Sequence, residues 1–320
     1  MRGLYLGDGA PEVREDLEAP TPTTGEVRVR LRLAGVCATD LALARGYMGF
    51  RGIPGHEFVG TALEGPLAGR RVVGEINAGC GTCADCTAGD PRHCSTRSVL
   101  GILSRSGAFA EELSLPASNL VPVPDEVPDA AAVFCEPLAA ALEIGEQIEL
   151  VPGTAALVAG DGRLGLLCAH ALARAGLTVT VAGRHPDRSS LLPAGVRHLQ
   201  GLVETDSQPE RAFDLAVEAT GRPEVLERVL ACVRPRGTVV LKTTSEARAE
   251  LDLAPLVVDE LTLVGSRCGR FEPALEVLRE GTIPTERFVH GRYPLARADE
   301  ALAHAGRAGT LKILIENDSS

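Results

Sequence analysis

A glycine-rich turn between an apolar run and a helical segment constrains the fold of this chain more than any other feature. Residues 160–165 read G-D-G-R-L-G, with the spacing G-x-G-x-x-G. They follow a strand-like apolar run at 154–159 and lead into a helical pattern at 165–175. In that context the first glycine makes the turn, the second lets a pyrophosphate approach, and the third allows close helix–strand packing. We predict a dinucleotide-binding turn; an ordinary strand-to-helix glycine turn is the alternative.

Strands and helices alternate around this turn. Further strand-like runs lie at 178–182, 213–218, 237–241 and 261–264, with helical segments between some of them. Such alternation predicts an α/β fold with a doubly wound parallel sheet, covered by helices on both faces. Residues 26–33 differ, because apolar and charged side chains alternate there as in a strand with one buried face. Short strands and turns continue from it to about residue 123, so the first part is predicted to be mostly β.

The end of the second strand of the α/β part decides which dinucleotide is favoured. NAD-binding chains place an acid there to bind the ribose hydroxyls. Here residues 181–188 read V-A-G-R-H-P-D-R, so Gly183 and Arg184 stand at that place and Asp187 lies farther along. A guanidinium can pair bidentately with a 2′-phosphate. The sequence therefore favours NADP over NAD; the alternative is that Arg184 only stacks on the adenine and NAD is accepted.

Four of the nine cysteines lie between residues 80 and 94. Cys80, Cys83, Cys86 and Cys94 form the pattern C-x2-C-x2-C-x7-C. Two-residue spacings let a tight loop wrap a tetrahedral zinc, which binds thiolate sulfur at about 2.3 Å. Four thiolates leave no open position, so the pattern predicts a structural zinc. Buried or redox-active cysteines and a cysteine-ligated iron–sulfur cluster are the alternatives.

A second set of metal-binding side chains is dispersed along the chain. Cys37, the pair His56 and Glu57, and Glu136 each have an ordinary explanation on their own: a small core residue, a hydrogen-bonded histidine, or an acid at a helix N-terminus. Together, a thiolate, an imidazole and carboxylates can hold zinc and leave a position for water or substrate. A zinc with such an open position polarises an alcohol oxygen and lowers its pKa.

These segments together resemble the zinc-dependent alcohol dehydrogenases of the medium-chain dehydrogenase/reductase superfamily. The resemblance runs nearly end to end and implies a Rossmann domain, residues 124–267, inserted in a β-rich GroES-like catalytic domain, residues 1–123 and 268–320. The similar stretches are the glycine turn, the four-cysteine loop, G-V-C-A-T-D at 35–40, G-H-E-F-V-G at 55–60, E-P-L at 136–138, V-E-A-T-G at 217–221 and G-S-R at 265–267.

The resemblance also implies roles for single residues. Cys37 and His56 bind the catalytic zinc, and Glu57 and Glu136 are its acidic partners, bound directly or through water. Thr39 matches the hydroxyl that passes on the substrate proton. The predicted cofactor-binding residues are Gly160, Gly162, Arg163, Leu164, Gly165, Gly183, Arg184, Arg188 and Thr220.

The chain departs from its relatives near the predicted proton route. Asp40 matches an acid that orients the zinc-binding histidine. Two residues later, many relatives carry a histidine that relays the proton to solvent, and this chain has Ala42. The segment after Gly60 is also short. These differences affect the proton route and the pocket shape, whereas the zinc ligands are kept.

The predicted activity is zinc-dependent hydride transfer between an alcohol and a carbonyl compound in a cleft between the domains, with two zinc ions per chain. Relatives with an acid after the histidine often act on polyols, sugars or amino alcohols, so the expected substrate is a small secondary alcohol, polyol, sugar or amino alcohol. One alternative is a zinc-independent reductase of quinones or enones, which the zinc ligands argue against. The other is a non-catalytic nucleotide-binding protein, which would hold only the structural zinc.

Charge and hydropathy narrow the possible partners. The net charge is −11, from 43 acidic and 32 basic residues, which disfavours broad electrostatic binding to nucleic acid or anionic lipid. No apolar run reaches the roughly 18 residues of a membrane span, and no signal-peptide pattern precedes Asp8 and Glu12. We expect a cytoplasmic protein, and the resemblance implies a homo-oligomer, either a dimer or a tetramer.

Overall fold

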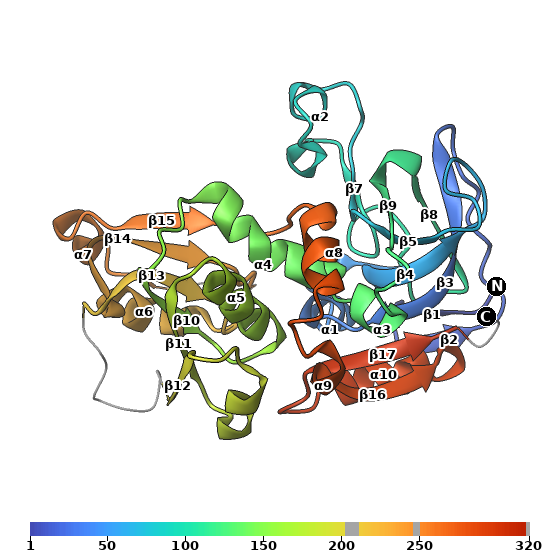
Figure 1. Cartoon of the computed structure of the whole chain (residues 1–320). Helices are drawn as coiled ribbons and strands as arrows, with labels where there is room; N and C mark the ends of the chain where they lie inside the picture. Colours follow the sequence, from blue (N-terminus) through green and yellow to red (C-terminus); the bar gives the residue numbers. More distant parts are fainter. Residues whose placement is uncertain (202–210, 246–249, 318–320) are drawn as a thin grey trace. The chain divides into compact units, whose positions relative to one another are not determined.

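The first unit of the chain is built around strand β3 (Glu26–Gly35), which the alternating pattern at 26–33 predicts. The computed structural model describes residues 1–201, 211–245 and 250–317 (Figure 1). The apolar positions of β3 are buried on one face, with Val29 and Leu31 fully covered, whereas Arg30 between them is exposed. This period of two is the expected result of burying one face of a strand.

Strand β3 lies at the centre of a seven-stranded sheet in the order β16-β17-β3-β4-β5-β9, with β8 also paired to β3. β17 pairs antiparallel with the end of β3, and β8 pairs with its start. A strand that follows the inserted domain therefore completes a sheet that begins before it. The other strands are β4 (Glu57–Ala62), β5 (Arg71–Gly74), β8 (Glu112–Pro116), β9 (Leu120–Pro122), β16 (Val289–Pro294) and β17 (Lys312–Glu316).

Short helices and two small hairpin-like sheets complete the first unit. A lobe that contains α2 extends away from the main sheet (Figure 1), and the antiparallel pair β6–β7 forms its base. The strands are β1 (Gly3–Tyr5), β2 (Glu12–Arg14), β6 (Asn77–Ala78) and β7 (Ser98–Val99). The helices are α1 (Ala38–Ala44), α2 (Ala84–Thr87), α3 (Asp129–Ala132), α8 (Phe271–Arg279), α9 (Thr285–Phe288) and α10 (Ala298–Ala305).

The second unit is a six-stranded parallel sheet in the order β12-β11-β10-β13-β14-β15. Numbered within the unit, this order is 3-2-1-4-5-6, that of doubly wound dinucleotide-binding sheets, so the Rossmann prediction is confirmed. The strands are β10 (Ala155–Ala159), β11 (Thr178–Gly183), β12 (Arg197–Gln200), β13 (Phe213–Glu218), β14 (Val233–Leu241) and β15 (Thr262–Gly265). The helices are α4 (Cys135–Gln147), α5 (Arg163–Arg174), α6 (Leu226–Cys232) and α7 (Ala254–Val258).

The strand order of this sheet reverses between β10 and β13, and this switch point positions the ligand site. Leu157 of β10 and Ala216 of β13 are completely buried, as expected for a sheet with helices on both faces. Ligands of such sheets bind outside the carboxyl ends of the strands, beside the switch point. The glycine turn that follows β10 lies at this edge.

The two compact units are residues 1–136 with 270–320, and residues 137–269. The predicted boundaries, after residue 123 and before residue 268, follow the change from a mostly β pattern to alternating strands and helices. The first unit extends to Glu136 because α3 packs against β3, β4, α8 and α9, which all belong to that unit. Helix α4 begins with Cys135 and Glu136 in the first unit and continues in the second.

Candidate functional site

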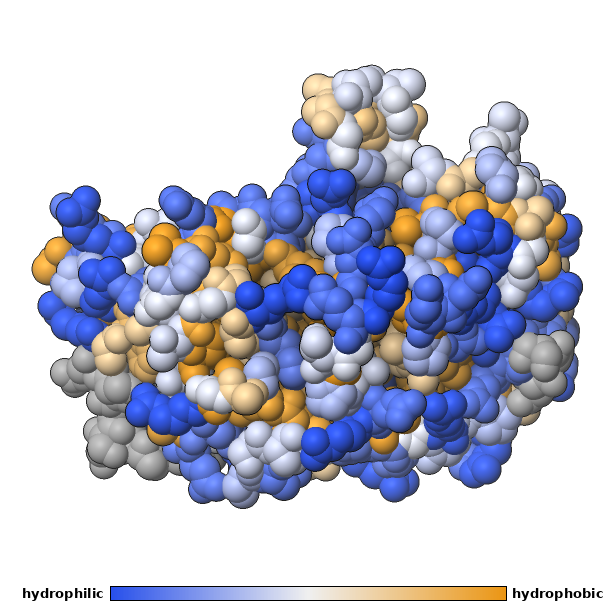
Figure 2. Space-filling model, viewed as in Figure 1, coloured by the Kyte–Doolittle hydropathy of each residue, from blue (hydrophilic) through white to orange (hydrophobic). Residues whose placement is uncertain are grey.

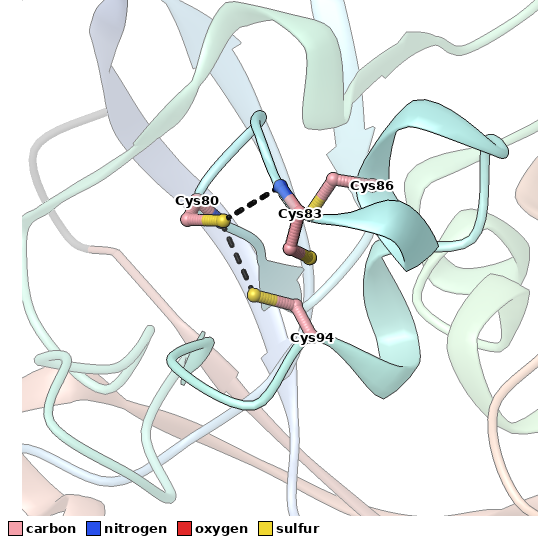
Figure 3. Close-up of side chains that lie close together, drawn as sticks. All are labelled: Cys80, Cys83, Cys86 and Cys94. Carbon is pink, nitrogen blue, oxygen red and sulfur yellow. Dashed lines mark hydrogen bonds between the residues drawn. The ribbon is translucent and has the colours of Figure 1, made fainter.

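The cysteine lobe brings its four thiols together. The sulfur atoms of Cys80, Cys83, Cys86 and Cys94 all lie within 4.8 Å of one another (Figure 3). Thiolates on a tetrahedral zinc at about 2.3 Å would lie about 3.8 Å apart, so only small shifts separate this cluster from a closed zinc shell. The cysteines are unpaired as disulfides. The cluster therefore fits the predicted structural zinc.

Backbone and hydroxyl groups around the lobe favour thiolate at part of the cluster. Hydrogen bonds from Thr82 and from the backbone N–H of Cys83, 3.4 Å from the sulfur, lower the pKa of Cys80 to about 5. The surrounding protein and the neighbouring thiols raise the pKa of Cys86 to about 12. Four sulfurs this close cannot all ionise without a cation, which is the behaviour expected of a metal-binding set.

The dispersed set converges in the first unit. The ligand atoms of Cys37, His56 and Glu57 lie within 4.8 Å of one another. Cys37 precedes α1, and His56 and Glu57 stand at the start of β4, where they are only 3% and 1% exposed. The sheet brings their segments together, because Glu57 of β4 pairs with Gly35 at the end of β3, two residues before Cys37. A soft sulfur, an imidazole and a carboxylate at this spacing fit zinc.

Asp40 ties the segments of this group together. Its carboxylate accepts hydrogen bonds from the backbone N–H of Cys37 at 2.8 Å and from that of Gly55 at 3.1 Å. The His56 Nδ1 atom lies 3.3 Å from Asp40 Oδ1, a charge contact rather than a well-formed hydrogen bond. A histidine held at Nδ1 presents Nε2 to a metal, so the position of Asp40 agrees with the orienting role that the resemblance implies.

The electrostatics of the group suit a cation. Burial lowers the pKa of His56, but the charges of Asp40 and Cys37 raise it, and the net result is well above the ordinary value. An environment that holds a proton this firmly on a fully buried imidazole can also hold a divalent cation in its place.

Lys312 contacts this group and was missed by sequence reasoning. Its ammonium forms an ion pair with the Glu57 carboxylate, with both side chains almost completely buried. The ammonium also lies 5.4 Å from the centre of the Phe134 ring. The available signal is a lysine inside the apolar strand L-K-I-L-I at 311–315, where a charge needs a buried partner.

Glu136 lies near the group but outside it. It is the second residue of α4 and does not belong to the set of atoms within 4.8 Å. Burial of its carboxylate raises the pKa to about 7; His56 and Lys312 lower it, and Glu57 raises it. These charge effects place Glu136 within electrostatic reach of His56, Glu57 and Lys312. Its role as a zinc partner stays a prediction.

Thr39 lies next to the same group, close to Cys37. Its hydroxyl oxygen lies 3.9 Å from the sulfur of Cys37, and the residue is half-buried on the first turn of α1. Ala42 follows on the same helix and offers no proton-transfer group. The predicted role of Thr39 remains sterically feasible, whereas the onward route differs from that of relatives with a histidine.

The glycine turn adopts the geometry that a dinucleotide needs. Gly160 has φ +113°, a value that other residues rarely adopt, and its N–H donates to Ala182 of β11. Gly162 is the N-cap of α5 without a side-chain cap, and a Cβ there would meet no atom within 4 Å. The uncapped N–H groups and open space at the start of a twelve-residue helix fit a phosphate.

The end of β11 differs from the sequence-based expectation, because an acid does stand there. A Cβ on Gly183 would lie 2.0 Å from the Cγ atom of Asp161, so the side chain of Asp161 fills the place of a strand-end residue. Arg184 is exposed, as a phosphate-binding residue would be. Arg188 is instead only 4% exposed, and its guanidinium contacts Asp161.

Thr220, the last predicted cofactor residue, lies just after β13. Its hydroxyl donates to the buried carboxylate of Glu218 at 2.6 Å and accepts from the N–H of Arg222 at 3.0 Å. These bonds fix the turn at the carboxyl end of β13, next to the switch point. Gly160, Gly162, Arg163, Leu164 and Gly165 lie on the turn and the first residues of α5. The cofactor assignments themselves stay predictions.

No membrane-spanning helix is present in the described part of the chain. Among the helices of residues 1–201, 211–245 and 250–317, none has the length and apolar character needed to cross a bilayer.

Two families of known proteins match successive parts of the chain. Residues 23–125 match the alcohol dehydrogenase GroES-like domain, and residues 164–280 match the zinc-binding dehydrogenase family. The first match covers Cys37, His56 and the cysteine lobe, and the second begins in the glycine turn.

Individual relatives span nearly the whole chain. An L-threonine 3-dehydrogenase of Streptomyces coelicolor is 32% identical over 98% of this chain and 96% of its own length. A zinc-binding dehydrogenase from Sinorhizobium meliloti bound to NADP has a TM-score of 0.87 and 26% identity, with 98% of each chain covered. A short chain alcohol dehydrogenase from Escherichia coli CFT073, complexed with NADH, has a TM-score of 0.85 and 25% identity over 99% of both chains.

Proposed function

Because the chain belongs to the zinc-dependent alcohol dehydrogenases of the medium-chain dehydrogenase/reductase superfamily, we propose that it interconverts an alcohol and a carbonyl compound with NAD(P) and a catalytic zinc. The observation that carries the proposal is the buried convergence of Cys37, His56 and Glu57 within 4.8 Å, with Asp40 behind them. Neither the zinc-independent reductase nor the non-catalytic nucleotide-binding protein needs such a group. A second set of possible metal ligands, in addition to the four cysteines of the lobe, therefore supports the proposal that the protein is an enzyme.

The residues at this site would divide the work. Cys37 and His56 would hold zinc, with Glu57 and Glu136 as acidic partners. Such a zinc would supply Lewis acidity that lowers the pKa of the substrate oxygen. Thr39 would relay the proton released by the substrate: its hydroxyl oxygen accepts that proton while its own proton passes on toward solvent. Asp40 would keep His56 oriented and Cys37 in place through its two backbone hydrogen bonds.

Lys312 would set the charge balance of the site. Its ammonium already neutralises the Glu57 carboxylate, with which it forms a buried ion pair. Because Lys312 occupies one side of the Glu57 carboxylate, we propose that Glu57 acts on the zinc mainly as a nearby acid shared with Lys312.

The proposed substrates are small secondary alcohols, polyols, sugars or amino alcohols. The name of the Streptomyces coelicolor relative specifies oxidation of L-threonine at carbon 3, which bears a secondary hydroxyl. Glu57 directly follows His56, as in the relatives that take such substrates. For the cofactor we propose NADP over NAD, supported by the exposed Arg184 at the end of β11. The two structural relatives hold NADP and NADH respectively, so the fold accommodates both.

We also propose that the protein is a homo-oligomer, either a dimer or a tetramer, through the second unit. Val257 and Val258 of α7 are 76% and 77% exposed, and neighbouring Leu253 is 61% exposed. Figure 2 shows apolar surface in the region of α7. In the described part of the chain β15 is an edge strand, and exposed edges beside apolar surface are sites of association. Measurement of the molecular mass of the wild type and of Val258→Glu by light scattering tests this. If both proteins have the mass of a monomer, the proposal is rejected.

The central experiment combines metal analysis with an activity screen. Elemental analysis of protein purified without chelator should give two zinc ions per chain. A screen of alcohols, polyols, amino alcohols and aldehydes with NADPH and NADH should then show zinc-dependent turnover. One zinc per chain with no turnover would favour the non-catalytic protein, and turnover of quinones that survives removal of zinc would favour the reductase.

A further inference from the structure

Asp161 occupies an unusual place in the second unit. It is the second residue of the glycine turn, yet its carboxylate reaches across to the end of β11 and lies against Gly183. The residue is only 5% exposed. The acid at the end of β11 is therefore supplied by the glycine turn, and a side chain at position 183 would collide with it.

Protein partners surround the Asp161 carboxylate. Oδ2 accepts the backbone N–H of His185 at 2.7 Å and lies 3.5 Å from Nε2 of His198. Oδ1 lies 3.0 Å from Nδ1 of His185 and 3.4 Å from the Arg188 guanidinium. A carboxylate offers about four acceptor sites, and four groups of the chain face them here. Ribose hydroxyls would have to compete with these groups for the carboxylate oxygens.

The corner as a whole is basic. Burial lowers the pKa of Arg188; the charges of Asp161 and Asp187 raise it, and those of Arg184 and Arg163 lower it further. Arg188, His185 and His198 thus contact one buried carboxylate, and Arg184 and Arg163 act electrostatically on Arg188. This is the place where the ribose 2′ position is recognised in doubly wound sheets. The excess positive charge suits a phosphate rather than a hydroxyl.

We propose that Asp161 is a positioning residue that organises a 2′-phosphate-binding corner at the end of β11. Its carboxylate lies against Gly183 and accepts the backbone N–H of His185, and so fixes the backbone on both sides of the exposed Arg184, where a 2′-phosphate would bind. The same residue contacts the buried Arg188 through its backbone carbonyl and its carboxylate. The inference rests on the proposed dinucleotide function, and it adds the residue that determines specificity. The acid in the glycine turn serves NADP recognition indirectly, as the counter-ion that orders the basic side chains.

The test uses two probes that differ only in the phosphate, 2′,5′-ADP and 5′-AMP. Isothermal titration on the full-length protein gives the dissociation constant of each and therefore their ratio. The wild type should bind 2′,5′-ADP more tightly. Asp161→Asn keeps the shape but removes the charge that holds Arg188, so the preference for 2′,5′-ADP should fall about tenfold, the lower end of the effect of a charged hydrogen bond.

A matched control removes the same charge from the neighbouring segment after β11. Asp187→Asn lies beside Arg188 but is exposed and makes no contact with the Asp161 carboxylate in the described structure. It should leave the preference unchanged or slightly higher. Equal effects of both variants would overturn the proposal, because net charge alone would then explain them.

The remaining outcomes are also decisive. A loss confined to 5′-AMP would show that Asp161 reads ribose hydroxyls, and an unchanged or increased ratio would show that it orders nothing that binds phosphate. If Asp161→Asn does not fold, His185→Ala removes the ring contact alone and should lower the same ratio. Because the probes lack nicotinamide, failure of this test leaves alcohol oxidation untouched, whereas absence of turnover would not affect these binding constants.

Discussion

The two candidate metal sites of the first unit are built in opposite ways. The cysteine lobe takes all four ligands from residues 80–94, near the surface, with Cys80 exposed. The group around Cys37 joins segments before α1 and at the start of β4, and its charge is balanced by a lysine 255 residues away. A contiguous site depends on local loop geometry, whereas an assembled site depends on the sheet that brings its parts together. Substitutions at the two sites should therefore have different kinds of effect.

The largest expected effect is on turnover through the assembled site. His56→Ala should abolish alcohol oxidation, because it removes a ligand of the zinc that lowers the pKa of a bound oxygen to about 7 from near 16 in bulk water. Zinc content should fall from two ions to one per chain, while 2′,5′-ADP binding in the second unit persists. A variant that retains most of the activity would show that the group around Cys37 is not the active site.

The next effect is on stability. Lys312→Met leaves the buried Glu57 carboxylate without its partner, and breaking a buried pair in this way costs about 3–5 kcal/mol. Urea unfolding should show this loss, and the double variant Lys312→Met with Glu57→Gln should recover most of it. Lys312→Arg, which keeps the charge, serves as the control. Equal stability of the single and double variants would mean that the pair contributes nothing.

A smaller effect is expected from the acid behind the ligands. Asp40→Asn keeps the shape of the side chain but removes the charge that faces His56, and changes behind a metal ligand typically cost about 10–100-fold in affinity or activity. Zinc affinity measured by competition with a chelator should fall by this factor, with the cysteine lobe unaffected. An effect on both zinc ions would indicate general damage to the fold.

The contiguous site should give the smallest functional effect. Cys86→Ser should release the structural zinc, because binding of such a metal contributes directly to folding. A loss of ~2 kcal/mol would lower the melting temperature by roughly 4–8 °C in a unit of this size. The remaining catalytic zinc should support turnover below that temperature. Complete loss of activity at 25 °C in a folded variant would mean that the two sites are more closely coupled than their construction suggests.

Local patterns predicted local structure well. The cysteine spacing and the glycine turn specify their own geometry within a few residues, and the apolar runs place β10, β11 and β13 nearly to the residue. Strand β12 was missed because its sequence, R-H-L-Q, lacks an apolar run and lies at the sheet edge. Strand β16 was missed for a similar reason, since it alternates half-buried and exposed residues.

Long-range partners could not be predicted in the same way. Cys37, His56, Glu57 and Glu136 were grouped through the family resemblance, because nothing in their spacing says that they meet. Lys312 stood outside every motif. The strand-end acid was sought at position 183, but it is supplied by Asp161 from another segment, a placement that only the pairing of β10 with β11 brings about.

The closure of β3 by β17 has a consequence for synthesis on the ribosome. In the sequence, β3 and Glu57 precede the second unit, whereas their partners β17 and Lys312 follow it. At about 5–20 residues per second, a separation of 255 residues takes roughly 10–50 s to translate. During that time the second unit can fold alone, while β3 keeps an open edge and Glu57 has no counter-charge. The nascent first unit is therefore the part that should need protection by chaperones, and the ion pair of Glu57 with Lys312 forms only when β17 emerges.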